Sequence, residues 1–442
     1  MSASDPTTRR HFGPFTLVLF GLAYMAPLIV LGTFGIVAQA SHGATASSYA
    51  LALVALLFTA ASYCKMAALH PVAGSAYTYV SHAMGRRTGF LIGWAVTLDY
   101  LFLPMVTWLI GAAYLHDSFP MLPMPALVLG FIAITTLLNI VGFRLAKGLN
   151  LLLMFVQAVV LVLFVKLAID FIGYPTPTAM WAPFVNPATN ISAIAAGAAV
   201  AAYSFLGFDA VTTLAEETRE PKKTMPRAIW LTALAGGVIF IAASYAAQLA
   251  HPGSEFHDVS AAGNEVALKI GGQWFGVVFL AGLIVAQLAS GVASQAAGAR
   301  LIYAMARDGV LPRQLLGRLH PKYGTPVGAV ILTGLIGLLA LGLTVESSTS
   351  FINFGAFSAF AAVNLSVVAT ALRERRPMTA GTLIGWYLAP LAGAAIDIWL
   401  LTQLEPQAIK LGLVWLVVGI VILAWLTRGF TRPPPALHVE EA

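Results

Sequence analysis

The chain has 442 residues, of which 59% are hydrophobic and 10% are charged, and its mean hydropathy is +0.84. Because soluble domains carry about 25% charged residues, this composition excludes a soluble multidomain protein and predicts a membrane protein. The net charge of +6 would suit nucleic-acid binding, but the sequence shows neither the motifs nor the clustered basic face that such binding needs. Cys64 is the single cysteine, so neither an intramolecular disulfide nor a thiolate metal site is expected.

Membrane-spanning helices are expected along the whole chain, since about 20 apolar residues suffice to cross a bilayer. The first apolar stretch follows Arg9 and Arg10 without a small-residue cleavage site, so we interpret it as a retained span and not as a signal peptide. The third and eighth stretches are long enough to tilt or to extend beyond the membrane. Twelve stretches qualify: 14–39, 46–68, 87–115, 121–142, 144–170, 191–217, 226–250, 273–304, 326–344, 349–372, 382–403 and 408–427.

The basic residues indicate the orientation of these spans. If the spans alternate in direction, only Lys166, Lys269 and Lys410 of the 24 Lys and Arg residues fall on the side opposite to the N-terminus. Cytoplasmic loops of membrane proteins carry such an excess of basic residues. The charge is therefore a topology signal, and it predicts that both termini are cytoplasmic.

The first span, FGLAYMAPLIVLGTFGIVAQ, contains Pro27 between several glycines. Proline cannot donate the helical hydrogen bond, and its ring crowds the preceding turn. One interpretation is a simple kink, which membrane helices tolerate. The other is a discontinuous helix whose free backbone groups bind a ligand, with Tyr24, Met25, Ala26 and Pro27 at the site.

The third span, GWAVTLDYLFLPMV, carries Asp99 about thirteen residues from its start, near the bilayer midplane at 1.5 Å per residue. A carboxylate at this depth is costly and needs a partner. No Lys or Arg is expected at that depth, so the partner can be an ammonium group of the substrate. The alternative is a protonated Asp99 that is hydrogen-bonded to a backbone carbonyl. Tyr100 either packs or adds a hydroxyl to the site.

The sixth span, AYSFLGFDAVTTLAEE, has Gly207 and Asp209 past its middle. A glycine there lets the helix break. Asp209 either exchanges a proton or caps the amides of a second half-helix, and the two roles are compatible. Glu216 and Glu217 follow at the expected cytoplasmic end, where acids are unfavourable, so we expect them to form ion pairs at an inner gate or to be solvated.

Aromatic side chains surround both interruptions. Their faces attract organic ammonium groups, which is worth roughly 0.5–2 kcal/mol each, although most aromatic residues simply pack. The remaining candidates for the binding site are Tyr203, Phe205, Leu206, Gly207 and Phe208 in the sixth span and Asn353 in the tenth.

The positions of the two interruptions suggest an internal repeat. Pro27 and Gly207 lie in spans that correspond to each other if the chain contains two halves of five helices. An odd number of spans inverts the second half, and paired interruptions of this kind are the best sequence indication of a transporter site at the midplane. The predicted units are 14–172 and 173–376, followed by two helices in 377–430, with tails at 1–13 and 431–442.

Three segments resemble the amino acid–polyamine–organocation (APC) superfamily. FLGFDAVTTLAEETREPKKTMPRAI (205–229) resembles the signature of its sixth helix, HPVAGSAYTYV (70–80) resembles the connection from its second to its third helix, and ARLIYAMARDGVLPRQLLGRLHPKYGTP (299–326) resembles its loop from helix 8 to helix 9. Within the superfamily, GLAYMAP, LDYLFLP and YSFLGFDAVTTLAEET are most similar to bacterial proton-coupled putrescine importers.

The resemblance implies an all-α fold of 12 transmembrane helices, a LeuT-type 5+5 inverted repeat plus two helices, in which helices 1 and 6 are discontinuous. It also implies that Asp99 faces the substrate and that Tyr203 is a gating aromatic. One departure is clear. Some relatives carry a lysine in helix 5 that is tied to proton coupling, whereas the matching residue here is Gln157, which cannot titrate.

These features together predict an importer of a short diamine, with putrescine expected, in the bacterial inner membrane. It would act by proton symport, without a cofactor or metal, and its partners would be the diamine, protons and the lipid bilayer. The alternative is an amino-acid transporter or an amine/amino-acid exchanger, in which half-helix N-termini would bind the substrate carboxylate. An enzyme is disfavoured because the nine histidines lie outside the spans or at their ends. A channel or a receptor is a weaker alternative.

Overall fold

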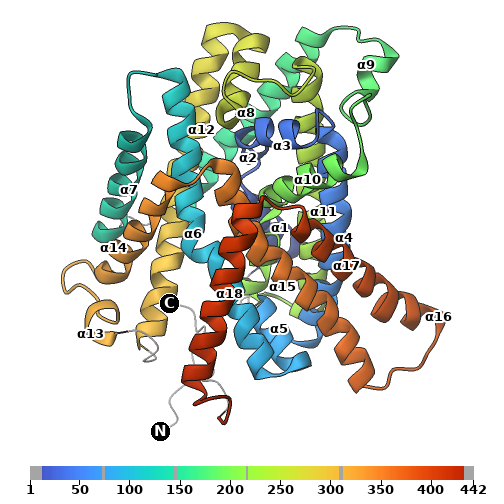
Figure 1. Cartoon of the computed structure of the whole chain (residues 1–442), viewed down its shortest axis with the longest axis vertical. Coiled ribbons are helices and arrows are strands. Elements are labelled where there is room, and N and C mark those ends of the chain that lie inside the picture. The colour runs from blue at the N-terminus through green and yellow to red at the C-terminus, as the bar shows by residue number, and fades with distance from the viewer. Residues whose placement is uncertain (1–11, 72–74, 143–146, 216–217, 308–311, 433–442) are drawn as a thin grey trace.

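The protein is described here from a computed structural model that covers residues 12–71, 75–142, 147–215, 218–307 and 312–432. These residues form helices and connecting loops, and the only extended pairing among them is an isolated bridge between Phe12 and Thr218. Figure 1 shows the helices as one bundle. The predicted all-α class is confirmed.

The first half of the chain forms the helices up to the interrupted sixth span. The elements are α1 (Pro14–Met25), α2 (Ile29–Gly32), α3 (Phe34–Ala40), α4 (Thr45–Leu69), α5 (Ser75–Met84), α6 (Arg86–Ser118), α7 (Met124–Val141), α8 (Lys147–Ile172), α9 (Pro177–Trp181), α10 (Ile191–Ala201) and the 3-10 helices η1 (Ala202–Phe205) and η2 (Asp209–Leu214).

The second half continues with long helices and short connecting turns. The elements are α11 (Pro221–Ala250), η3 (Val259–Ala261), α12 (Ala262–Arg307), α13 (Arg313–Leu316), α14 (Val327–Ile336), η4 (Gly337–Gly342), α15 (Val345–Arg373), α16 (Ala380–Thr382), the π-helical η5 (Leu383–Leu388), α17 (Ala389–Thr402) and α18 (Pro406–Leu426).

Eleven helical segments of the described chain are long and apolar enough to cross a membrane, and each corresponds to one of the predicted spans. The predicted ninth span appears as a shorter apolar helix over Val327–Gly342, whose second part is 3-10 helical. The eighth begins earlier than predicted, because α12 runs from Ala262 through a non-helical Gly272. The protein is a multi-pass membrane protein.

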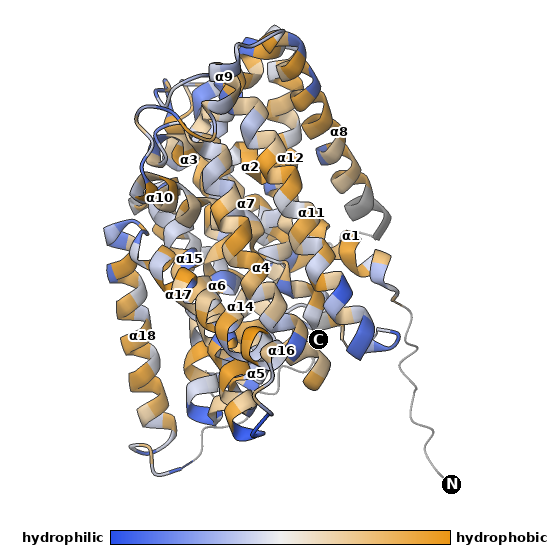
Figure 2. Cartoon of the chain, turned by 90° about the vertical axis from the view of Figure 1, so that its right-hand side faces the viewer, coloured by the Kyte–Doolittle hydropathy of each residue, from blue (hydrophilic) through white to orange (hydrophobic). Residues whose placement is uncertain are grey.

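The surface of the bundle is apolar along its middle. Figure 2 shows hydrophobic residues along the sides of the helices and hydrophilic ones mostly near the two ends. On α18, large apolar side chains are exposed, and Trp425 retains 71% of its accessible surface. In water such a surface would be unfavourable, whereas acyl chains match it.

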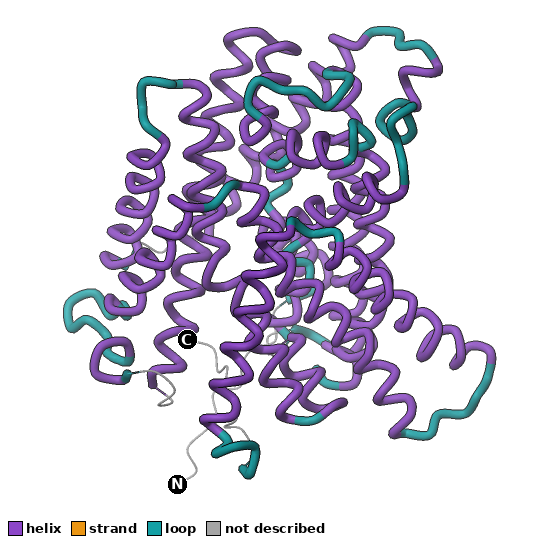
Figure 3. The backbone as a smooth tube through the Cα atoms, in the orientation of Figure 1, coloured by secondary structure: helices purple, strands orange, loops and turns teal. Residues whose placement is uncertain are grey.

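The centre of the bundle is formed by α4, which packs against α11, α10, α15 and α17. Figure 3 shows short loop segments inside the helical body, where the first and sixth spans are interrupted. Near them, α6 contains Pro104, which cannot donate to the Tyr100 carbonyl one turn earlier. Gly298 of α12 approaches this carbonyl so closely that a Cβ at 298 would lie 2.5 Å from its oxygen.

Candidate functional site

The first span is interrupted at Ala26 and Pro27. After Met25 the backbone of Ala26 turns left-handed, with φ 46° and ψ 79°, which is unusual for a residue with a side chain. The Ala23 carbonyl accepts from the Ala26 amide at 3.3 Å, in place of the amide that Pro27 lacks. The helix resumes at Ile29, so the prediction of a discontinuous first helix is confirmed.

The sixth span is interrupted at Leu206 and Gly207. The α-helix ends at Ala201, a single 3-10 turn reaches Phe205, and Leu206 is extended, with ψ 131°. Gly207 has φ 103°, which L side chains rarely adopt. The second half restarts at Asp209 as a six-residue 3-10 helix, so the break is confirmed, although its second half is tighter than an α-helix.

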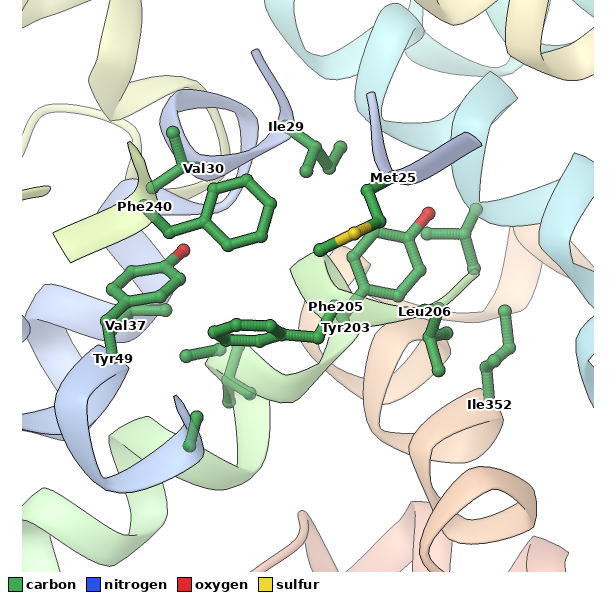
Figure 4. Packing of buried hydrophobic residues seen from close by; sticks show 14 of the residues in the cluster. Met25, Ile29, Val30, Val37, Tyr49, Tyr203, Phe205, Leu206, Phe240 and Ile352 are labelled. Carbon is green, nitrogen blue, oxygen red and sulfur yellow. The ribbon is translucent and has the colours of Figure 1, made fainter. Parts of the chain in front are cut away.

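The two interruptions contact each other. A Cβ built on Gly207 would meet the Tyr24 ring, with 2.9 Å to Cε1 and 3.0 Å to Cγ. Figure 4 shows Met25, Tyr203, Phe205 and Leu206, which come from the two interrupted spans, in one packed cluster with Tyr49 and Phe240. The predicted residues on both spans are therefore neighbours in space.

Asp99 lies beside this junction. One of its carboxylate oxygens is buried and accepts no hydrogen bond, although the residue as a whole is half-buried. Asp99 interacts electrostatically with Asp209 and with the hydroxyl groups of Tyr24 and Tyr203. Among the described residues, neither Asp99 nor Asp209 forms an ion pair. Two carboxyl groups thus share a site that contains no described cationic side chain.

Asp209 is held by a hydroxyl group from a distant segment. Ser75, at the start of α5, donates to Asp209 Oδ2 at 2.8 Å, and Thr212 donates to the Asp209 carbonyl at 2.6 Å. The carboxylate also lies against its own backbone N–H. These contacts hold the carboxylate in place, and both roles of Asp209, proton exchange and capping, stay predictions.

Tyr24, Ala26, Pro27, Asp99, Tyr100 and Asp209 are half-buried, whereas most of the surrounding residues are buried. Tyr100 also interacts electrostatically with both carboxyl groups. An ammonium group beside these residues would meet carboxylate oxygen atoms, aromatic rings and backbone carbonyl oxygen atoms.

Three predicted residues make other contacts in this conformation. Phe205 packs edge-on against Phe240, and Phe208 is fully buried between Tyr63 and Phe360. The Asn353 side chain donates to the Ala199 carbonyl at 2.8 Å, near the end of α10. These contacts support the broken helix, and a direct role of these residues in substrate binding stays a prediction. Glu216 and Glu217 lie outside the described residues.

Gln157 is 8% exposed on α8, and its side-chain oxygen accepts no hydrogen bond. Sequence reasoning missed three residues with polar groups near the centre: Ser75, Tyr63 and Asp397. Asp397 had a usable signal, since it stands within the apolar run AGAAIDIWLL. Ser75 and Tyr63 had none, because hydroxyl groups are common in membrane helices.

A bundle with two interrupted helices that meet beside unpaired carboxyl groups defines a membrane transport protein. Residues 17–379 match the amino acid permease family, and the chain belongs to this family, which is a family of transporters and not of enzymes. The APC superfamily resemblance and the 12-helix LeuT-type fold are thereby confirmed.

Curated relatives resemble the chain over nearly its whole length. It is 38% identical over 424 residues to the low-affinity putrescine importer PlaP of Escherichia coli. The aligned residues cover 95% of this chain and 94% of that protein. It is 26% identical over 461 residues to the branched-chain amino acid permease BcaP of Bacillus subtilis, covering 98% and 96%. A methylthioribose transporter of Bacillus subtilis is 26% identical over 445 residues, covering 95% and 94%.

Proposed function

We propose that this protein imports a short diamine, putrescine in the first place, across the bacterial inner membrane by proton symport and alternating access. The proposal rests mainly on Asp99. This carboxylate lies beside the two broken helices, and one of its oxygen atoms is buried and accepts no hydrogen bond. The nearby Asp209 and the lack of a described ion pair at either acid favour a cationic ligand. The similarity to PlaP supports putrescine as the substrate.

In the proposed complex, Asp99 pairs with one ammonium group of the diamine. Backbone carbonyls at the interruptions near Ala26 and Leu206 accept hydrogen bonds from the other ammonium group. Tyr24 and Tyr203 contact the methylene chain and add cation–π attraction, worth roughly 0.5–2 kcal/mol for each favourable contact. Asp209 exchanges the coupled proton.

We expect the transport movement to reflect the internal repeat, whose two predicted units are residues 14–172 and 173–376. The broken helices together with α4 and α11 rock against the remaining helices. Both termini lie in the cytoplasm, which the distribution of Lys and Arg supports.

Three ligands with the same carbon chain test the substrate class: putrescine, butylamine and 4-aminobutanoate. Thermal shifts of the purified protein should be largest with putrescine, because only this ligand carries two ammonium groups and no carboxylate. Uptake of labelled putrescine into proteoliposomes should then rise when an inward-acid gradient is imposed.

An amino-acid transporter would give the opposite ranking. Stabilisation by 4-aminobutanoate or by leucine, without stabilisation by putrescine, would refute diamine import and favour a site built around a substrate carboxylate. Uptake of putrescine that ignores the proton gradient would leave the substrate assignment intact and remove the symport assignment.

A further inference from the structure

A third carboxyl group lies inside the membrane body, away from the site described above. Asp397, on α17, is 1% exposed. Its Oδ2 accepts hydrogen bonds from Thr59 Oγ1 on α4 at 3.0 Å and from Asn364 Nδ2 on α15 at 2.9 Å. Asn364 also donates to Thr59 at 2.9 Å, so the three side chains form a closed triangle of hydrogen bonds.

Among the described residues, no cation faces Asp397. The helices α4, α15, α10 and the turn η5 pack against α17. The Lys65 ammonium on α4 donates to the Gly385 carbonyl and lies 5.7 Å from the centre of the Trp386 ring. The helix α10 has no titratable group. On α4, Tyr49 bonds to Ser204 and Cys64 bonds to the Pro226 carbonyl. The remaining groups are Tyr63 on α4, Tyr387 on η5, and Glu346 and Arg373 at the two ends of α15.

Two neutral donors on one oxygen only partly replace the hydration that a carboxylate loses on burial. In the membrane interior such an unpaired charge is expensive, whereas the protonated acid is neutral and remains hydrogen-bonded. More polar surroundings would reduce this cost of the charged form.

Tyr63 is close to both Asp397 and the substrate site. Thr59 and Tyr63 are four residues apart on α4 and so lie on the same face. The Tyr63 hydroxyl is buried without a hydrogen-bond partner and interacts electrostatically with both Asp209 and Asp397. It lies near Ser75, which donates to Asp209. The ring of Tyr63 packs against Phe208, next to the interruption.

A small cavity also lies between Asp397 and the interrupted sixth span. Its volume is about 10 Å³, and it is lined by Asp397 together with Ala202 and Phe205 of the interrupted sixth span. Movement of η1 during transport would therefore change the surroundings of Asp397 directly.

We propose that Asp397 is a second proton-binding carboxyl of the transport cycle, linked to Asp209 through Thr59 and Tyr63. A proton that reaches Asp397 neutralises the carboxylate, and its release restores the charged form that Thr59 and Asn364 stabilise. The coupling to transport rests on the proposed symport, whereas proton binding by itself does not.

Infrared difference spectra of the purified wild-type protein, recorded between acid and alkaline pH, test proton binding without any transport assay. Asp397→Asn should remove one carbonyl band of a protonated acid. Thr59→Val should change the frequency of that band, because it removes a hydrogen bond to the carboxyl group while keeping the acid. Asp170→Asn is the matched control, because Asp170 is an exposed acid paired with Lys166, and the buried-acid band should persist.

The link to transport is tested in proteoliposomes. Asp397→Asn should lose acceleration of uptake by an inward-acid gradient while keeping counterflow, and Tyr63→Phe should slow gradient-driven uptake.

Equal carbonyl bands of the protonated acid in wild type and Asp397→Asn, or gradient-driven accumulation by that variant at the wild-type rate, would overturn the proposal. If the wild type does not carry putrescine but the band is lost in Asp397→Asn, the proposed function fails and the proton site stands. If Asp397→Asn does not fold, an unchanged band frequency in Thr59→Val refutes the assignment.

Discussion

The Tyr24 ring lies directly against the Cα of Gly207, so that the interruptions of the first and sixth spans touch. A Cβ at position 207 would come within 2.9 Å of Tyr24 Cε1 and 3.0 Å of Cγ, where real Cβ atoms essentially never lie. Gly207 also has φ 103°. The same position therefore requires glycine for its backbone conformation and for the close approach of Tyr24.

Gly207→Leu should abolish transport. A side chain at positive φ costs roughly 1–2 kcal/mol, and the clash with Tyr24 adds to this cost, since the two interruptions would be forced apart. Gly130→Ala is the control, because a Cβ there meets no atom within 4 Å and α7 should gain nearly 1 kcal/mol of helix propensity. Uptake rates of both variants in proteoliposomes check the prediction, and active Gly207→Leu would show that the break is dispensable.

Asp99→Asn should remove most binding of the diamine while the protein stays folded. A desolvated ammonium group that loses its carboxylate partner costs on the order of 3–5 kcal/mol, which is a loss of affinity of roughly a hundredfold to several thousandfold. Calorimetric titration with putrescine measures the loss. Asp170→Asn should bind normally, because the Asp170 side chain is 58% exposed. Unchanged affinity of Asp99→Asn would make this carboxylate structural.

Asp209→Asn should still bind diamine but should not respond to an imposed proton gradient. The amide keeps an acceptor for the Ser75 hydroxyl, which donates to Asp209 at 2.8 Å, but it cannot carry a proton between the two sides. Uptake with and without an inward-acid gradient, with counterflow as the control for binding, decides the matter. Gradient-driven accumulation at the wild-type rate would restrict Asp209 to capping.

Gln157→Ala should weaken affinity or packing without affecting proton coupling. Gln157 is buried on α8 and does not titrate, so it cannot exchange the coupled proton. The measurement is the ratio of putrescine uptake with a pH gradient to uptake without one. A variant that binds diamine normally and loses only its gradient dependence would contradict this prediction.

Phe208→Ala should reduce stability more than it changes substrate affinity. The ring is fully buried, and its centre lies 5.3 Å from that of Tyr63 and 5.4 Å from that of Phe360. Truncating such a ring costs roughly 3–5 kcal/mol through the cavity that it leaves. Thermal unfolding followed alongside putrescine titration separates the two effects, and a large loss of affinity at unchanged stability would restore Phe208 to the binding site.

The sequence by itself determined the class of the protein, the places of its spans and the two interruptions. These features are local: hydrophobic length decides whether a segment can cross a bilayer, and Pro27 and Gly207 act on their own backbone. The sequence also marked Asp99 and Asp209, since acids inside apolar runs are conspicuous.

Only the tertiary structure decided which groups meet. Tyr24 lies on Gly207, Ser75 bonds to Asp209, and Asn353 supports the end of α10 across a long separation in sequence. No periodicity encodes such pairings, because each depends on how α4, α6, α15 and α17 pack around the broken helices. The isolation of Asp397 from the described cations likewise follows from the side chains that neighbouring helices bring to it, which is a property of the packed bundle and not of its own span.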